Sequence, residues 1–283
     1  MSTTISVLDA AILGVVEGLT EFLPVSSTGH LKITEGLLGI PVDDPAVVGF
    51  TAVIQVGAIA AVLVYFFGDI ARITTAWFRG LRHREARTDR DYRFGWWVIY
   101  ATIPIVVVGI AAQELIKGPL ASLWIVAGSL IVGSAVMWLA ERLGTQKRGE
   151  QDVTLADTMI VGSSQILALL FPGFSRSGAT LSASLLLGLD RVSATRLSFF
   201  LSIPALLGAS VLQSVTEYDN ISGGVGWGNT IVATVVSFVV GYAAVAWLLK
   251  FIAGHTYTIF IVYRIVLGSL LMVLLATGAI EAQ

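Results

Sequence analysis

The chain has 283 residues, of which 55% are hydrophobic and only 13% are charged, and its mean hydropathy is +0.84. A soluble domain usually carries about 25% charged residues, so this composition excludes an ordinary soluble enzyme and indicates an integral membrane protein. The formal net charge of −2 gives no sign of a nucleic-acid partner, and we expect none. Without cysteine, the chain has no disulfide and no thiolate-bound metal.

In chain order, the first apolar stretch, about 5–40, is interrupted by proline, glycine and hydroxyl residues, and a similar stretch covers about 155–189. Interrupted backbone is tolerated at membrane depth only where protein or water satisfies its polar groups. We therefore expect two re-entrant or broken helical segments. Six continuous stretches reach the roughly 20 residues that a membrane-crossing helix needs. These six predicted transmembrane helices are 47–68, 95–112, 121–140, 197–216, 229–249 and 256–280.

The connection 69–94 contains seven arginines and is predicted to be a basic cytoplasmic loop, because positive residues collect on the inner side of membranes. Alternation of the spans then places 142–148 and 250–255 inside. It places 114–119 and 217–228 outside, together with both termini. The predicted location is the bacterial cytoplasmic (inner) membrane, crossed several times.

The two interrupted stretches resemble each other. EGLTEFLPVSSTGH (17–30) aligns with QILALLFPGFSRSG (165–178), so that Pro24 matches Pro172. Each interrupted stretch is followed by three spans, and the two halves have opposite predicted orientation. This pattern is typical of an inverted-topology repeat, whose site lies near the bilayer midplane where the broken segments meet. The predicted organisation is one all-α membrane domain, 1–283, with repeats 1–140 and 153–283.

Two carboxylates, Glu17 and Glu21, lie four residues apart in the first broken segment and so share one face of a helix. Ionised carboxylates inside a bilayer are costly without a partner, a cation or a proton. The pair suits a divalent cation held by oxygen ligands, or one carboxylate acting as a proton carrier. A structural polar pair is the alternative.

The next residues, PVSSTGH, contain the hydroxyls of Ser26, Ser27 and Thr28 after the helix-breaking Pro24. If a helix restarts near Ser26, then Ser27 and His30 share a face and the new N-terminus favours an anion. A hydroxyl beside a base is an arrangement for nucleophilic catalysis, although a membrane histidine is as often a structural hydrogen-bonding residue.

The second broken segment carries PGFSRSGAT, in which Arg176 lies between Ser175 and Ser177. A forked cation with hydroxyl and amide donors suits phosphate oxygens. An ion pair between Arg176 and a glutamate of the first segment is the structural alternative, and it is compatible with phosphate binding. Together the two segments supply carboxylates, a hydroxyl, a base and an anion clamp, which is the equipment of phosphoryl transfer.

At these motifs the chain resembles the undecaprenyl-diphosphate phosphatase family of the bacitracin-resistance type, over nearly its full length. The motifs are EGLTE, PVSSTGH and PGFSRSGAT. The resemblance implies a phosphoric anhydride hydrolase that converts undecaprenyl diphosphate to undecaprenyl phosphate and inorganic phosphate. It further implies recycling of the lipid carrier for peptidoglycan and cell-wall synthesis and for cell shape, bacitracin (antibiotic) resistance, Mg²⁺ or Ca²⁺ dependence, and a site open to the outer, periplasmic side.

Carried over residue by residue, the resemblance implies that Glu17 and Glu21 bind the metal or direct proton transfer. Ser27 becomes the candidate nucleophile, with His30 as its acid/base partner, and Arg176 clamps the diphosphate. The further expected substrate-binding residues are Ser26, Thr28, Ser175, Ser177 and Thr180. Whether Ser27 attacks phosphorus or only positions water stays open.

A transporter or flippase for an anionic isoprenoid lipid is the competing function, because inverted repeats with broken helices are a transporter architecture. A structural scaffold explains neither the acids nor Arg176. The expected partners are the lipid substrate, membrane lipids and a second copy of the chain in a homodimer. The one charged residue in the last span, Arg264, is expected to extend toward the cytoplasm or pair with a polar neighbour, with a headgroup role as the alternative.

Overall fold

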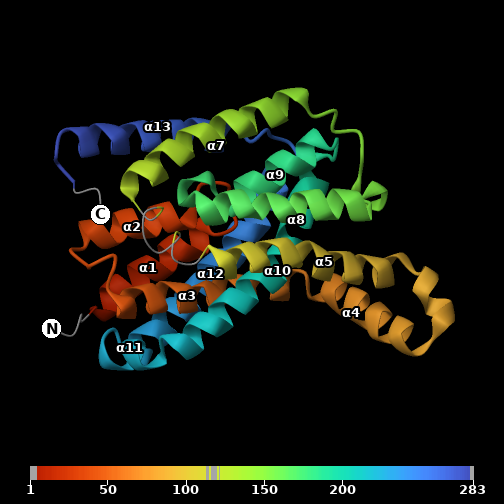
Figure 1. Cartoon of the computed structure of the whole chain (residues 1–283), viewed down its shortest axis with the longest axis horizontal. Coiled ribbons are helices and arrows are strands. Elements are labelled where there is room, and N and C mark those ends of the chain that lie inside the picture. Colours follow the sequence, from red (N-terminus) through yellow and green to blue (C-terminus); the bar gives the residue numbers. More distant parts are fainter. Residues whose placement is uncertain (1–4, 113–114, 116–119, 121, 281–283) are drawn as a thin grey trace.

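The computed structural model describes residues 5–112, 115, 120 and 122–280, and within them the protein is helical and has no β-sheet (Figure 1). Six of the described helices are long and apolar enough to cross a membrane, which confirms the six predicted spans of a multi-pass membrane protein. They are α3 (Pro45–Tyr65), α5 (Arg90–Ala111), α7 (Leu123–Leu143), α10 (Arg191–Thr216), α12 (Trp227–Ile252) and α13 (Thr258–Ala276).

Both interrupted stretches are broken helices, as predicted. The first consists of α1 (Val7–Thr20) and α2 (Ser27–Leu37), and the second of α8 (Leu155–Leu170) and α9 (Arg176–Leu186). α1 and α8 begin alike, each with a hydroxyl residue whose side chain caps the backbone three residues on and an aspartate that reaches back. α2 and α9 have 11 residues each. The two halves therefore repeat the same local structure.

Helix pairing follows the same two-fold pattern. α1 packs on α12, and α8 packs on α5. Glycines allow both contacts. A Cβ added to Gly14 would lie 2.5 Å from the carbonyl oxygen of Ala233, and one added to Gly162 would lie 2.5 Å from that of Ala101. α3 likewise packs on α12 and α10 packs on α5, while α3 also contacts α10 and α7 contacts α13. If each helix is replaced by its counterpart in the other half (α1 by α8, α3 by α10, α5 by α12 and α7 by α13), the same pairs result. The pattern supports the inverted repeat, whose opposed orientation stays a prediction.

The predicted basic cytoplasmic loop, 69–94, is helical rather than irregular, and its cytoplasmic location stays a prediction. The segment continues as α4 (Phe67–Arg82), a 3-10 helix (Arg84–Thr88) and the first turn of α5. α4 forms because it has an apolar face as well as arginines: the rings of Trp77 and Trp96 lie 5.3 Å apart, and Gly80 packs directly against Tyr92. α4 and α5 therefore make a helical hairpin that extends beyond the rest of the molecule (Figure 1).

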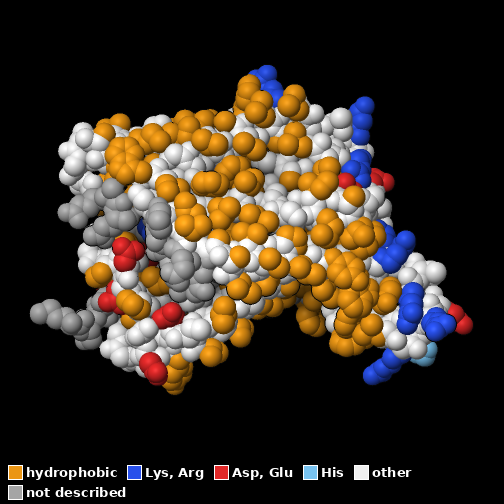
Figure 2. Space-filling view, viewed as in Figure 1, with side chains coloured by type: hydrophobic (Ala, Val, Ile, Leu, Met, Phe, Trp, Pro, Cys, Tyr) orange, Lys and Arg blue, Asp and Glu red, His pale blue; other side chains and the backbone are white. Residues whose placement is uncertain are grey.

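Charged side chains collect at the two ends of the molecule, with hydrophobic side chains between them (Figure 2). In that view arginines and lysines lie mostly at the end with α4, and several acids lie at the opposite end, beside the start of α1 and beside α11 (Tyr218–Gly223). The last turn of α13 is also at this acidic end. An apolar belt between charged ends is the surface that a lipid bilayer requires.

Candidate active site

Each broken helix restarts at a serine with a positive φ angle, Ser26 at 74° and Ser175 at 70°. Ser26 caps α2 by accepting a hydrogen bond from the Gly29 amide at 3.3 Å, and Ser175 caps α9 by accepting one from Gly178 at 3.2 Å. The structural match is therefore Ser26 with Ser175, and so Ser27 with Arg176. This is one residue away from the alignment on the prolines, because the second turn contains one more residue between proline and serine.

The two turns are bonded to each other. The Ser26 hydroxyl donates to the carbonyl oxygen of Pro172 at 2.7 Å, and the Ser177 hydroxyl donates to that of Leu23 at 2.9 Å. Each turn thus uses a hydroxyl to satisfy a carbonyl that the other turn leaves outside a helix. The broken segments of the two halves meet inside the protein, as the sequence predicts.

A fully buried guanidinium, that of Arg264, holds both turns from one side. It donates to the carbonyl oxygens of Pro24 at 3.0 Å and Phe174 at 2.8 Å, and to the Ser134 hydroxyl at 3.1 Å. The expectation that Arg264 extends toward the cytoplasm is wrong, because its side chain is 0% exposed. Pairing with polar neighbours is confirmed. Its bonds to backbone carbonyls of both turns support a structural role over the headgroup role.

Glu21 connects the two halves at the centre of the site. Its Oε1 accepts a hydrogen bond from Arg176 Nη2 at 2.6 Å, and its Oε2 accepts one from the Ser27 hydroxyl at 2.5 Å. The amide of Gln55 also donates to Oε2 at 3.3 Å. The Arg176 guanidinium lies over the Phe22 ring, 6.0 Å from its centroid, which restricts its orientation. The structure thus brings Glu21, Ser27 and Arg176 into direct contact.

Glu17 lies one helical turn before Glu21 and is fully buried, and neither of its carboxylate oxygens has a hydrogen-bond partner among the described residues. A buried carboxylate without partners is costly, so it needs a proton or a cation. The described residues contain no cluster of three His, Asp or Glu side chains. Mg²⁺ commonly binds through one or two carboxylates and completes its shell with water and substrate phosphates. Glu17 and Glu21 fit that mode.

Both ring nitrogens of His30 have partners other than Ser27, so the acid/base role of His30 stays a prediction. Nδ1 lies 2.7 Å from the Ser26 carbonyl oxygen, and Nε2 lies 2.6 Å from the Tyr263 hydroxyl. A carbonyl only accepts, so Nδ1 carries the proton and neutral Nε2 accepts from tyrosine. Tyr263 was missed from the sequence. Its only signal there is that it precedes Arg264 in an otherwise apolar span.

The other predicted substrate-binding residues mostly bond within the protein. The hydroxyls of Ser175 and Ser177 lie 3.1 Å apart, and Thr180 lies 2.6 Å from the Ser198 hydroxyl. All three are buried, whereas Thr28 is exposed on the first turn of α2. The serines therefore shape the turn that presents Arg176. Substrate contacts of these residues stay predictions.

Comparison with known proteins gives consistent matches along the chain. The family model described as "Bacitracin resistance protein BacA" matches residues 10–270. A protein of Streptomyces coelicolor named undecaprenyl-diphosphatase 1 is 67% identical over 99% of this chain and 100% of its own length. Its namesake from Streptomyces avermitilis is 66% identical with the same coverage, and an undecaprenyl-diphosphatase of Cutibacterium acnes is 50% identical over 97% of this chain and 99% of its own. The chain belongs to the bacitracin resistance protein BacA family.

Proposed function

We propose that this protein hydrolyses undecaprenyl diphosphate to undecaprenyl phosphate and inorganic phosphate, and so recycles the lipid carrier and confers bacitracin resistance. The observation that carries this proposal is the double use of Glu21, which holds a hydroxyl from one half and a guanidinium from the other. The proposed nucleophile Ser27, its proton acceptor Glu21 and the anion clamp Arg176 are thus in direct contact. The names of the relatives supply the substrate.

The contacts suggest a role for each group. The Ser27 hydroxyl donates to Glu21, so Glu21 is placed to accept the proton as the serine oxygen attacks the terminal phosphorus. The bond from that phosphorus to the bridging oxygen breaks, and undecaprenyl phosphate leaves with the electron pair. Arg176 neutralises charge on the phosphoryl oxygens. Water then cleaves the phosphoserine, releasing inorganic phosphate and restoring the Ser27 hydroxyl.

Direct attack by water is the second route. There Ser27 only orients the water, Glu21 accepts the water proton, and no phosphoserine forms. Rapid acid quenching of the full-length enzyme with substrate labelled in the terminal phosphate separates the routes. Label on a peptide containing Ser27 supports the covalent route, and its absence during active turnover supports the water route.

A divalent cation fits the two acids at the end of the first helix, and we propose Mg²⁺ or Ca²⁺ held by Glu17 in α1 and by Glu21, the residue after it, together with substrate oxygens. When bound, such an ion neutralises diphosphate charge. The partnerless oxygens of Glu17 support this assignment. Mg²⁺ should raise the melting temperature of the wild type. We expect Glu17→Gln to need about tenfold more Mg²⁺ for the same rise. Glu35→Gln, which changes another buried glutamate, leaves it unchanged. A wild-type protein that binds neither Mg²⁺ nor Ca²⁺ would refute the assignment.

Phosphate release in detergent tests the proposed activity, because it requires neither a bilayer nor a gradient. We expect release from undecaprenyl diphosphate by the purified protein, and its loss in Ser27→Ala and Arg176→Ala, with both variants still folded at the assay temperature. Thr277→Val, at the exposed end of α13, is the matched hydroxyl control. A lipid transporter without hydrolase activity would release no phosphate, yet would move the labelled lipid across proteoliposomes.

We further propose that the end bearing α4 lies in the cytoplasm of a bacterial inner membrane. The arginines of that end support this orientation by the positive-inside rule. The start of α1 and the end of α13 then face outside, and the site receives diphosphate from the outer side. Labelling of single cysteines in intact cells tests this: a membrane-impermeant thiol reagent should reach Cys at Thr277 and not at Arg84. A homodimer stays a prediction, tested by mass measurement in solution.

A further inference from the structure

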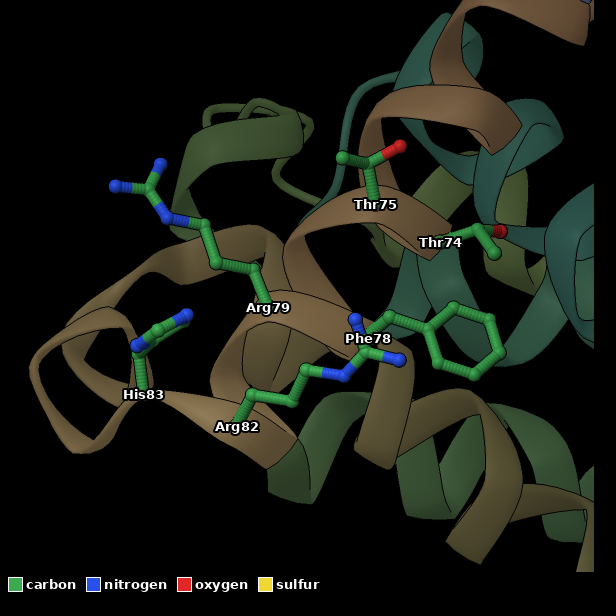
Figure 3. A pocket seen from close by; sticks show the side chains of 6 residues that line it. All are labelled: Thr74, Thr75, Phe78, Arg79, Arg82 and His83. Atoms are coloured by element: carbon green, nitrogen blue, oxygen red, sulfur yellow. The ribbon is translucent and has the colours of Figure 1, made fainter.

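The exposed face of α4 carries a hollow of about 370 Å³ that the proposed reaction does not use. Its lining offers guanidinium, imidazole and hydroxyl groups and contains no carboxylate. Figure 3 shows Arg79 and Arg82 extending from α4, with His83 at the end of the helix. The lining residues are Thr74, Thr75, Phe78, Arg79, Arg82 and His83.

The positive charge of this hollow is uncompensated. Neither Arg79 nor Arg82 forms a salt bridge with any residue that the structure describes. A second hollow on the same hairpin, of about 400 Å³, differs because it includes Asp91 and another aspartate in its lining. There Arg72 pairs with Asp69 at 3.0 Å and with Asp91 at 2.5 Å. Arg79 and Thr75 line both hollows, but the first hollow adds Arg82 and has no carboxylate in its lining, so it presents two unpaired cationic donors for an anion.

Apolar side chains are exposed along the same helix. Phe67, Phe78 and Leu81 are 71%, 55% and 42% exposed. The helix also directly follows the membrane-crossing α3 and precedes α5, so it lies where spans leave the apolar belt. Exposed aromatic and aliphatic groups beside arginines suit the boundary between acyl chains and headgroups. A free anion or a nucleic acid would make no use of the exposed Phe78 and Leu81.

We propose that this hollow binds the headgroup phosphate of an anionic membrane phospholipid. Arg79 and Arg82 bind the phosphate oxygens, and the hydroxyls of Thr74 and Thr75 add neutral donors. The acyl chains lie against Phe78 and the adjoining apolar surface of α4. The site is independent of the proposed hydrolysis, since it shares no residue with the contacts of Glu21.

Native mass spectrometry of the full chain in detergent tests the site, with dioctanoyl phosphatidylglycerol as the probe. Dioctanoyl phosphatidylcholine and inorganic phosphate are the comparison ligands. We expect phosphatidylglycerol to bind at least tenfold more tightly than phosphatidylcholine. Each arginine near an anionic lipid contributes about fivefold, so Arg79→Gln with Arg82→Gln should weaken binding about 25-fold. Arg79→Lys with Arg82→Lys should retain part of the affinity.

The matched control is Arg84→Gln with Arg93→Gln, which removes two exposed arginines of the same hairpin that do not line the hollow. It should change affinity by less than twofold. An equal loss in this control would show diffuse attraction and overturn the proposal, as would equal affinity for the two lipids. Competition by inorganic phosphate at the same concentration as the lipid would also overturn it. If the double variant melts early, each single glutamine variant should lose about fivefold, and no loss in either would refute the site.

Discussion

Arg176 and Glu21 form an ion pair across the two halves of the protein, with Nη2 and Oε1 2.6 Å apart and their side chains 13% and 3% exposed. The same carboxylate accepts a hydrogen bond from the Ser27 hydroxyl, so it orients both Arg176, the proposed phosphate clamp, and Ser27, the proposed nucleophile. In the proposed reaction, a substrate phosphate would compete with Oε1 of Glu21 for Arg176, while Oε2 keeps the hydrogen bond from Ser27 and would accept its proton.

Glu21→Gln should remove this proton acceptor and lower kcat about 10²- to 10⁴-fold, the usual contribution of a general base. The glutamine keeps the shape of the side chain but leaves the Arg176 guanidinium without its charged partner, so the melting temperature should also fall. Phosphate release and thermal melting check both expectations. Glu85→Gln, in the exposed 3-10 helix, is the control. Full activity of Glu21→Gln would exclude the carboxylate as the base.

Tyr263→Phe should lower the free energy of unfolding by about 1 kcal/mol, because it removes one hydrogen bond from His30, and thermal melting of the purified variant measures the loss. The aromatic stacking, with ring centroids 5.6 Å apart, is retained. If tyrosine acts through histidine, then Tyr263→Phe should have no further effect in a His30→Gln background. Additive losses would show independent roles. Tyr218→Phe, on the exposed α11, controls for loss of a phenol.

Arg264→Met should destabilise the protein by about 3 kcal/mol or more, because buried carbonyls of both turns lose a charged donor. Arg264→Lys keeps the charge but cannot bridge the two turns, so it should recover only part of the stability. Thermal melting of the purified variants measures the loss, with Arg84→Lys as the control. A melting temperature unchanged in Arg264→Met would contradict the bridging role.

The attachment of α4 to α10 should weaken in acid. Burial alone would raise the pKa of the Asp69 carboxyl, but the hydrogen bonds and charges of Arg196 and Arg72 outweigh it and hold the pKa below its usual value. A lowered pKa stabilises the fold at neutral pH, and this stability is lost as pH falls below about 3.9 toward the folded-state pKa. Asp69→Asn should therefore melt earlier than the wild type at neutral pH.

The difference between Asp69→Asn and the wild type should narrow as the pH falls through that window, which melting curves in detergent measure. Asp219→Asn, an exposed change on α11, should show no such narrowing. A difference in melting temperature that does not change with pH would mean that packing, and not the charge of Asp69, attaches the hairpin to α10.

Much of the fold follows from patterns that act locally. Length and hydropathy predict the six spans, and the proline and hydroxyl clusters predict both breaks. The contact among Glu21, Ser27 and Arg176 follows from charge, because polar groups inside a bilayer must find one another. The helix α4 was not predicted, although Ile70, Ile73 and Trp77 recur at helical spacing between its arginines.

Other features depend on backbone geometry that no residue type records. Arg264 bonds to carbonyls that become available only because the helices break at Pro24 and Pro172. Ser26 adopts a positive φ angle, which a sequence does not reveal outside glycine. His30 bonds to Tyr263 on α13, a partner 233 residues away in the chain that no local pattern identifies.

The guanidinium that serves both turns also constrains motion. A carrier that alternates access rocks one repeat against the other about its central site. Such rocking here would pull Pro24 and Phe174 apart and leave Arg264 with unsatisfied donors in a dry interior, at a cost on the order of several kcal/mol. The same bridge keeps the reacting groups in register. A catalyst gains from that rigidity, whereas a rocking transporter would be slowed by it.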